Sequence, residues 1–459
     1  MINGAVSFWW GSLPRQARGA PLVGDLDVDV AVVGGGLTGL WTAYHLARAA
    51  PGLRIAVLEE RFVGFGASGR NGGWLTNEIT GGVEQYRRSH GSAAVDAFQR
   101  AMNGAVADVV AVATAEGIDA DLRAGGELTV ARNPAQRQRL RASFEAAAAR
   151  AGTDVEWLPV GAVRERVAVA GAEAGVWQPH CARLHPAKLV DGLARAVGRL
   201  GVRFHEGTRV EEIGSRAGRP WARTAAGTVR ADVVVRATEG FTTRLPGLRR
   251  EWLPLNSSMI VTPPLPPGTW DHIGWAAAET LADAAHAYVY AQRTADGRVA
   301  IGGRGVPYRF GSRLDADGRT DPRTVQTLRR ILGDMFPVLR DVEPEHAWSG
   351  VLGVPRDWHA TVGLDRATGL AWAGGFVGTG VTASNLAGRT LRDLVLGRGT
   401  ELTALPWVQH RVRRWEVEPL RWLAVTALYR AYHLADRQEA RGSLRTSRLA
   451  AVADRVAGR

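Results

Sequence analysis

Apolar residues near the start of the chain follow two different periods. Residues 28–33 form a β-branched run, which is typical of a strand buried on both faces, and residues 55–58 repeat it. The stretch between them has apolar residues at helical spacing, namely Leu37, Leu40, Trp41, Tyr44 and Ala47. The order strand, helix, strand predicts a Rossmann-type βαβ unit over residues 27–60.

The same pattern predicts elements along the rest of the chain. Helices are expected over residues 84–115, 134–151 and 186–200, the last beginning at Pro186 and ending before Gly201. Strands are expected at 125–131, within 202–213 and at 233–235. Alternating strands at 251–262, 286–292 and 298–303 favour an antiparallel sheet.

The second buried run, at 233–235, lies far along the chain from the first βαβ unit, so the nucleotide-binding domain is predicted to be discontinuous. The predicted class is α/β and α+β, a doubly wound parallel sheet with an interleaved antiparallel-sheet substrate domain and a helical tail. We assign residues 1–85, 155–250 and 341–400 to the nucleotide-binding domain. Residues 86–154 and 251–340 form the substrate domain, and residues 401–459 form a basic C-terminal extension.

The βαβ unit carries G-x-G-x-x-G at its first turn. Gly34 allows the tight turn, Gly36 lets a diphosphate approach the backbone, and Gly39 lets the helix pack closely on the strand. Free N–H groups and the helix dipole at this helix start attract an anion. Glu59 directly follows the second strand, where a carboxylate accepts hydrogen bonds from an adenosine ribose. An unphosphorylated ribose is favoured, so FAD or NAD rather than NADP.

Composition narrows the classes of function. The single cysteine, Cys181, excludes an intrachain disulfide, and we expect a cytoplasmic location with no signal peptide or membrane-spanning run. The net charge is +12, and Lys188 is the only lysine among 57 basic residues. The basic residues are spread along the chain without a nucleic-acid motif, so we expect no nucleic-acid partner.

Two further stretches are rich in glycine. Residues 61–75 read RFVGFGASGRNGGWL, which suits a loop that approaches phosphate or a flat ring. Residues 374–381 read GGFVGTGV and open another predicted helix. A plain NAD dehydrogenase needs neither stretch.

Most of residues 25–400 resembles the flavin-dependent amine and amino-acid oxidases. The features that carry the resemblance are GGGLTG, Glu59, GFGASGRNGG and GFVGTGV. That family includes D-amino-acid oxidase, glycine oxidase and sarcosine oxidase. The ASGRNGG and DGRVAIGGRG stretches look most like γ-glutamylputrescine oxidases and aminophosphonate oxidoreductases.

The resemblance implies an FAD cofactor and a set of cofactor-binding residues. The first turn and Glu59 would hold the diphosphate and ribose, the second stretch would run to the flavin, and the third would present N–H groups to the flavin N1/O2 edge. The residues implied are Gly34, Gly36, Leu37, Thr38, Gly39, Glu59, Glu60, Gly66, Ala67, Ser68, Gly69, Asn71, Gly72, Gly73, Trp74, Val210, Ala237, Thr238, Gly375, Gly378, Thr379, Gly380 and Val381.

Two departures from the family pattern affect the chemistry. Cys181 lies outside the C-terminal cofactor segment and residues 67–73 lack histidine, so we expect non-covalent FAD. Some members activate oxygen with a lysine on a strand of the substrate domain, whereas Lys188 lies at the start of the 186–200 helix. The expected reaction is oxidation of a small amine or amino acid to the imine by hydride transfer, with O2 reduced to hydrogen peroxide. A dehydrogenase that passes electrons to a quinone or carrier protein and a non-catalytic flavin-binding subunit stay as alternatives.

Hydride transfer needs an aimed C–H bond and a dry pocket rather than a catalytic dyad. Pocket residues should therefore be aromatic, with one or two polar anchors. The candidates are Trp74, Tyr288, Tyr290, Arg304 and Trp348. Tyr288 and Tyr290 alternate on one face of a predicted strand, and that face belongs either to the pocket or to the core. Trp74 and Trp348 either line the pocket or pack in the protein interior. Arg304 pairs with a substrate carboxylate or phosphonate, or it is a solvated surface arginine.

The remaining expectations concern metals and partners. His180, His185, His346 and His359 lack metal-ligand spacing, so no metal site is predicted. The tail after residue 405 mixes arginines with tryptophans and leucines. It is expected to cap its own domain or a partner subunit, with contact to an anionic membrane as the alternative. A monomer or a homodimer is expected.

Overall fold

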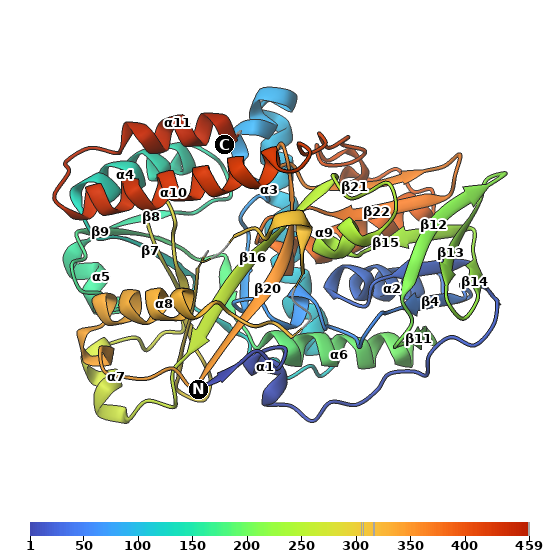
Figure 1. The fold of residues 1–459 in the computed structure, drawn as a ribbon, viewed down its shortest axis with the longest axis horizontal. Helices are drawn as coiled ribbons and strands as arrows, with labels where there is room; N and C mark the ends of the chain where they lie inside the picture. Colours follow the sequence, from blue (N-terminus) through green and yellow to red (C-terminus); the bar gives the residue numbers. More distant parts are fainter. Residues whose placement is uncertain (304, 306, 315–316, 458–459) are drawn as a thin grey trace.

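The computed structural model describes residues 1–303, 305, 307–314 and 317–457 of the 459-residue chain. Within these residues the chain forms two lobes that lie side by side (Figure 1). One lobe is built on a six-stranded sheet and the other on a nine-stranded sheet. The predicted mixed class, with one mainly parallel and one mainly antiparallel sheet, is confirmed.

The six-stranded sheet contains the predicted βαβ unit. Its strand order is β11 (Arg203–His205), β4 (Ile55–Leu58), β3 (Val30–Val33), β15 (Val233–Arg236), β22 (Leu370–Gly374) and β21 (Thr361–Asp365). The first five strands are parallel, and β21 pairs antiparallel with β22. The carboxyl ends of β4, β3 and β15 therefore meet at one edge, which is where such sheets bind nucleotides.

Both faces of this sheet are covered, as its β-branched runs predicted. Val30 and Val32 point into a core shared with helices α2 (Leu37–Ala49), α6 (Pro186–Arg199) and α9 (Gly380–Val395). Ala31 and Val33 pack against a four-stranded sheet instead. That sheet has the order β12 (Val210–Arg216), β13 (Arg219–Thr224), β14 (Thr228–Arg230) and β2 (Leu26–Asp27). Since side chains alternate sides along a strand, only an unbroken apolar run fills both cores.

The nine-stranded sheet forms the second lobe. Its order is β1 (Ile2–Asn3), β20 (His346–Pro355), β16 (Trp252–Val261), β19 (Val299–Gly303), β18 (Tyr290–Arg293), β17 (Thr280–Asp283), β7 (Glu127–Ala131), β9 (Ala174–Gln178) and β8 (Glu156–Pro159). Strands β16 and β20 pair along their whole length from Trp252 with Pro355 to Val261 with His346. Helices α5 (Val160–Arg166), α7 (Pro267–Ile273) and α8 (Pro322–Met335) share a hydrophobic core with this sheet.

Smaller elements join the lobes. A three-stranded sheet consists of β5 (Trp74–Thr76), β10 (Cys181–Arg183) and β6 (Arg123–Ala124). The long predicted helix is α3 (Val83–Ala115), with non-helical backbone at Gly91, and the next predicted helix is α4 (Pro134–Ala148). These segments bring residues after the second glycine-rich stretch to the substrate lobe.

The predicted domain bounds stay a proposal, and strand pairing changes how we would draw them. Strands β8, β9 and β20 lie within the ranges 155–250 and 341–400 that we assigned to the nucleotide-binding domain, yet they pair in the nine-stranded sheet. The reason is strand pairing: β9 pairs antiparallel with β7, and β20 with β16. A strand has no local sequence signal for which of two sheets it joins.

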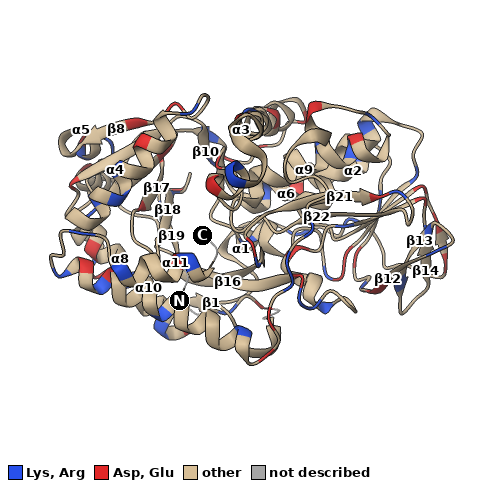
Figure 2. Cartoon of the chain, turned by 90° about the horizontal axis from the view of Figure 1, so that it is seen from above, with Lys and Arg blue, Asp and Glu red and all other residues tan. Residues whose placement is uncertain are grey.

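The C-terminal extension folds back over the substrate lobe of its own chain (Figure 1). Helices α10 (Leu420–Ala440) and α11 (Arg448–Ala457) follow a segment, 405–419, that was predicted helical and is largely irregular. Buried Trp407 and Trp415 anchor this connection, and prolines at 406 and 419 interrupt helix formation. No helix in the described part of the chain is long and apolar enough to cross a bilayer. Figure 2 shows Lys and Arg positions interspersed with Asp and Glu positions in both lobes.

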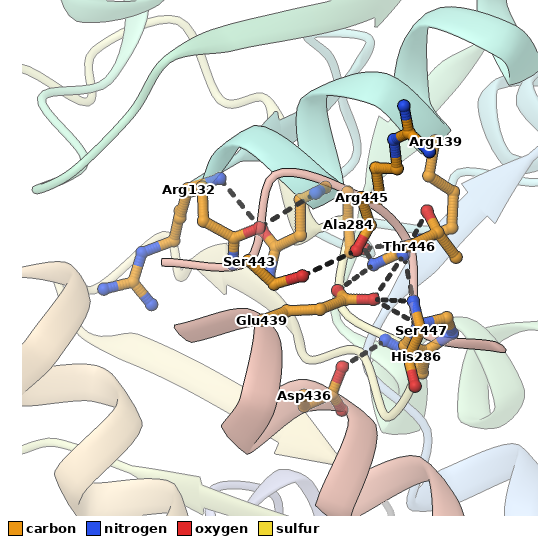
Figure 3. A network of polar contacts seen from close by, with 12 residues as sticks. Arg132, Arg139, Ala284, His286, Asp436, Glu439, Ser443, Arg445, Thr446 and Ser447 are labelled. Carbon is orange, nitrogen blue, oxygen red and sulfur yellow. Dashed lines mark hydrogen bonds and ion pairs between the residues drawn. The ribbon is translucent and has the colours of Figure 1, made fainter. Parts of the chain in front are cut away.

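A buried carboxylate fastens the extension to the lobe (Figure 3). Glu439 has a fully buried side chain, which accepts hydrogen bonds from Arg139 at 3.1 Å and from the Ser447 N–H at 2.9 Å. Its Oε1 also lies 2.9 Å from His286 Nε2, and the backbone N–H of His286 donates to Asp436. The network therefore joins α10, α4 and the turn before β18.

Replacing Glu439 with alanine is expected to lower the free energy of unfolding by about 3 kcal/mol, because Arg139 and His286 lose a buried carboxylate partner. Urea denaturation measures the change. The matched control is Glu145→Ala, which removes the exposed pair between Glu145 and Arg141 within α4 and should cost about 0.5 kcal/mol or less. Equal losses in the two variants would contradict the assigned role of the network.

Candidate functional site

A cavity lies at the carboxyl edge of the six-stranded sheet. It is bordered by the ends of β3, β4 and β15 and by the second glycine-rich stretch. The predicted cofactor residues that line it are Gly34, Gly36, Thr38, Glu59, Glu60, Gly66, Ala67, Ser68, Val210, Ala237 and Thr238. The geometry thus brings together residues from four separate segments of the chain.

The first glycine turn is too tight for side chains. Gly34 has φ +110°, and a Cβ there would lie 2.5 Å from the Ala237 carbonyl oxygen. At Gly39 a Cβ would lie 2.0 Å from the Gly34 carbonyl oxygen. Gly36 differs from these two glycines. A Cβ at Gly36 would lie 2.9 Å from the Ser68 hydroxyl oxygen and would otherwise face the cavity. This is the division of roles that the motif predicts.

The cavity wall fits an anionic dinucleotide. The N-cap residue of α2, Gly36, has no side chain, so the helix directs its N-terminus and positive dipole end toward the cavity. The Leu37 N–H donates to Ser68 Oγ at 2.8 Å, which joins the first glycine turn to the second stretch. The cavity wall also includes arginines that the motifs did not predict, Arg61, Arg209 and Arg244. Backbone donors and cations together suit a diphosphate.

Glu59 lines the first cavity directly after β4, and its contact with the ribose stays a prediction. Its Oε2 accepts from the Gly35 N–H at 2.8 Å, and its Oε1 accepts from the Arg61 N–H at 2.9 Å. Burial raises the pKa of Glu59 to about 7, although the two N–H donors act in the opposite direction. Its neighbour Glu60 pairs with Arg244 at 2.9 Å.

The second glycine-rich stretch is held by side chains from elsewhere. Trp9 Nε1 donates to the Asn71 carbonyl at 2.9 Å, and Trp10 Nε1 donates to the Gly64 carbonyl at 3.2 Å. Asn71 Oδ1 in turn accepts from the Gly73 N–H at 2.8 Å. The N-terminal tryptophans therefore fix the backbone of the loop.

The third glycine turn is tied to the first cavity by Glu239, which sequence reasoning missed. Glu239 lines that cavity, and its carboxylate accepts from the Gly353 N–H at 2.9 Å and the Phe376 N–H at 3.0 Å. Burial raises its pKa to about 7, against these donors. Helix α9 then begins at Gly380 without a side-chain cap among the described residues. No motif signals an acid at position 239, because its partners are distant in sequence.

A second cavity lies between the third glycine turn and the nine-stranded sheet. Phe376, Val377 and Thr379 border it on the cofactor side. Thr129, Val176 and Tyr288 border it on the substrate side. Thr379 Oγ1 lies 2.6 Å from Thr80 Oγ1, which joins the turn to the loop after β5.

The five predicted pocket residues have different places. Tyr290 packs against Gly72, where a Cβ would lie 2.7 Å from its ring, and its hydroxyl lies 2.9 Å from Ser257 Oγ. The rings of Trp74 and Tyr290 pack edge to face, with their centroids 6.1 Å apart. The buried Nε1 of Trp74 has no hydrogen-bond partner in the described chain. Trp348 is fully buried and donates to the Arg70 carbonyl at 2.8 Å, which makes it a packing residue.

Tyr288 lines the second cavity but precedes β18, so the prediction that it shares a strand face with Tyr290 was wrong. The backbone turns there because the N–H groups of His286 and Ala287 bind Asp436 of α10. Arg304 lies outside the described residues.

Histidines elsewhere meet groups that sequence spacing could not show. The fold brings His359 together with Asp357 and His410, with possible ligand atoms within 4.8 Å of one another. His410 Nε2 lies 2.8 Å from Asp357 Oδ2, and His359 Nδ1 lies 2.8 Å from the Asp357 carbonyl oxygen. Hydrogen bonds within the group therefore account for the short distances between these three residues.

A family model described as FAD dependent oxidoreductase matches residues 29–394 of the chain. A relative from Rhizobium meliloti (strain 1021), named "Probable oxidoreductase OrdL", is 29% identical over 425 residues, which cover 88% of this chain and 91% of the relative. The gamma-glutamylputrescine oxidoreductase of Escherichia coli (strain K12) is 29% identical over 420 residues, which cover 89% and 93%. The crystal structure of glycine oxidase from Geobacillus kaustophilus has a TM-score of 0.71 at 23% identity, covering 84% of this chain and 100% of that one, which shows a shared fold.

Gly36→Ala is expected to fold normally and to be purified with little FAD. Its Cβ would lie 2.9 Å from Ser68 Oγ, which can shift by a few tenths of an ångström, and it would enter the side of the cavity where the motif predicts the diphosphate. The ratio of flavin to protein absorbance and the urea midpoint measure the two effects separately. Gly39→Ala is the contrasting variant, and it should lose stability as well, because its Cβ meets a backbone carbonyl at 2.0 Å.

FAD affinity is expected to rise about tenfold from pH 6 to pH 8, because the ribose hydroxyls donate to the ionised form of Glu59, whose pKa is about 7. Fluorescence titration of the apoprotein with FAD measures this. Glu59→Gln should bind FAD more weakly and without that pH dependence, whereas Glu211→Gln at an exposed position should behave as wild type. An unchanged pH profile in Glu59→Gln would remove this carboxylate from ribose recognition.

Proposed function

The chain belongs to the family of FAD-dependent oxidoreductases, and we propose from this premise that it oxidises a small amine or amino acid to the imine, with O2 as the acceptor and H2O2 as a product. That the protein is an FAD-dependent oxidoreductase for amine-type substrates follows from the family and from its named relatives. The product imine is hydrolysed by water to a carbonyl compound. FAD, when bound, supplies the hydride acceptor.

One observation supports this proposal: the three glycine turns border two cavities that are linked through Glu239. Gly36 and Ser68 line the first cavity together with Glu239, and Glu239 accepts a hydrogen bond from Phe376 in the third turn. Phe376 and Thr379 then line the second cavity. A dinucleotide with a flat ring at one end fits this arrangement, with the adenosine half at β4 and the ring toward the second cavity.

The protein's own part in the reaction is to orient and to exclude water. The uncapped N-terminus of α9 at Gly380 would stabilise negative charge at the flavin N1/O2 edge. Tyr290 and Trp74 pack beside Gly72 and would limit the movement of a ring placed there. The second cavity is large enough to admit a small substrate, which speaks against a non-catalytic flavin-binding subunit.

Non-covalent attachment of FAD is part of the proposal. Cys181 is buried in β10 with its Sγ 3.2 Å from Thr280 Oγ1. Neither cysteine nor histidine occurs among the described residues that line the two cavities.

One observation favours a dehydrogenase as the second candidate. Lys188 lies on α6, and its Nζ pairs with Asp121 at 2.7 Å. In the described structure Lys188 lines neither of the two cavities. A lysine that activates oxygen beside the flavin is therefore replaced by some other cation, or electrons leave to a quinone or a carrier protein.

Mixing the holoenzyme with a panel of amines and amino acids without air is expected to bleach the oxidised-flavin absorbance with at least one of them. Admitting air should restore the colour and release hydrogen peroxide, which a peroxidase assay measures. Bleaching that persists in air but reverses with a quinone or dye would identify the dehydrogenase. A protein that binds FAD and is bleached by no amine or amino acid would contradict the proposed function.

A further inference from the structure

The second cavity is bordered by one side of helix α4. Leu140, Ser143, Phe144 and Ala147 line it, and Arg150 lines it from the turn that follows the helix. Side chains three and four positions apart lie on the same side of a helix, which is the spacing of these residues. The α4 segment therefore contributes a mostly apolar stripe and one guanidinium group to the cavity wall.

The guanidinium group of Arg150 contains a buried donor that nothing in the described chain accepts from. Its Nη1 atom is buried and has no hydrogen-bond partner there. Burial lowers the pKa of Arg150, and the charge of Asp96 on α3 acts in the opposite direction. Arg150 nevertheless forms no ion pair with Asp96 or with any other acid of the described residues. A cationic N–H group is thus left without an acceptor at the cavity wall.

An unpaired cationic donor in such a place calls for a partner from outside the chain. Apolar side chains such as Phe144 and Val176 line the same cavity, so the surroundings of Arg150 offer little polar compensation. Buried polar groups in folded proteins nearly always have a hydrogen-bond partner, and a buried charge without one is costly. An anionic ligand group would supply both an acceptor and the opposite charge.

Two carboxyl groups also line this cavity, and neither forms an ion pair with Arg150 in the described structure. Glu127 is buried, and its Oε2 accepts from Thr76 Oγ1 at 3.1 Å and from Gln178 Nε2 at 3.0 Å. Burial, followed by the charge of Glu78, raises the pKa of Glu127 to about 8, so this group is largely uncharged at pH 7. Glu127 therefore does not oppose an anion beside Arg150 at that pH.

Arg150 and the third glycine turn border the cavity from different lobes. Helix α4 packs on β7, β8 and β9 of the nine-stranded sheet. The turn from Phe376 to Thr379 precedes α9, which packs on α2 and α3. Figures 1 and 2 both show α4 in the substrate lobe and α9 in the other lobe. A ligand that reaches from the turn to Arg150 must therefore extend across the cavity.

We infer that Arg150 binds the anionic end of the substrate, and that the substrate is an amine with a carboxylate at the end remote from its reacting carbon. This rests on the proposed function, which places the flavin ring toward the third turn. The planar fork of an arginine suits a carboxylate, because two parallel N–H···O bonds can form. A small α-amino acid carries both groups on one carbon, so its carboxylate would stay near the flavin.

The first test measures anion binding separately from oxidation. Pentanoate is the probe, because it has a carboxylate but no amine to oxidise, and pentanamide is its uncharged counterpart. In isothermal titration of the holoenzyme, pentanoate should bind about tenfold more tightly than pentanamide. Arg150→Met should weaken pentanoate binding about tenfold and remove most of the difference between the two probes. Arg150→Lys, which keeps the charge but not the fork, should fall between wild type and Arg150→Met.

Arg137→Met is the matched control. Arg137 is an exposed arginine of the same helix and does not line the cavity, so its replacement should leave pentanoate binding unchanged. Flavin content and the urea midpoint of each variant show whether the fold is intact. Equal pentanoate affinities in wild type and Arg150→Met would overturn the inference, and so would an equal loss in Arg137→Met.

The second test locates the carboxylate relative to the reacting carbon. Three five-carbon amines are compared by flavin bleaching without air, namely 5-aminopentanoate, 2-aminopentanoate and pentylamine. We expect 5-aminopentanoate to bleach the flavin at the lowest concentration, and its advantage over pentylamine should disappear in Arg150→Met. Bleaching by 2-aminopentanoate at a lower concentration than 5-aminopentanoate would contradict the remote position of the carboxylate.

Failure of this inference differs from failure of the proposed function. Pentanoate binding that depends on Arg150, in a protein that no amine or amino acid bleaches, would keep the anion site and remove the oxidation. Bleaching by amines, with pentanoate binding insensitive to Arg150→Met, would keep the oxidation and remove the anion site.

Discussion

The site depends on backbone N–H groups of the glycine-rich loops. Hydrogen bonds from other parts of the chain hold the backbone of these loops in position. The loop between β4 and β5 has little regular structure, so buried side chains from distant segments hold it. Glu206 accepts from the Val63 N–H at 2.8 Å and the Arg18 N–H at 2.9 Å. Arg70 donates from Nε to the Phe65 carbonyl at 2.7 Å. Buried polar groups persist where each has a partner, and here the partners are the peptide groups of the loop.

The two cavities differ in their charged groups, and this follows from how each is built. The first is bordered by the N-terminus of α2 and by two sets of charged residues, the arginines Arg61, Arg209 and Arg244 and the acids Glu59, Glu60 and Glu239. The second is bordered by strands and by a loop that carry Glu78 and Glu127. Glu239 lines the first cavity and binds the turn that borders the second, so one buried acid sets the spacing between them.

The local features of this fold could be predicted, and its long-range features could not. The run from Val30 to Val33 predicted a strand with two buried faces, and the spacing of Gly34, Gly36 and Gly39 predicted the turn. Both could be predicted because each pattern lies within a few residues. The roles of Glu239 and Glu127 depend on partners more than fifty residues away. The membership of β8, β9 and β20 in the second sheet depends on strand pairing in the same way. A single sequence carries no direct record of such contacts.

Protonation connects the ligands to the stability of the fold. Burial raises the pKa of Glu59 and Glu239 to about 7 and that of Glu127 to about 8, from an ordinary value of 4.5. A carboxyl group whose pKa is higher in the folded chain takes up a proton on folding, so it costs stability as the pH rises from about 4.5 to its folded pKa. Below that range both states are protonated and the cost disappears. For Glu59, ribose hydroxyls in the first cavity would supply donors to the ionised form. Binding of the cofactor there would therefore offset an electrostatic cost that the protein bears at neutral and alkaline pH.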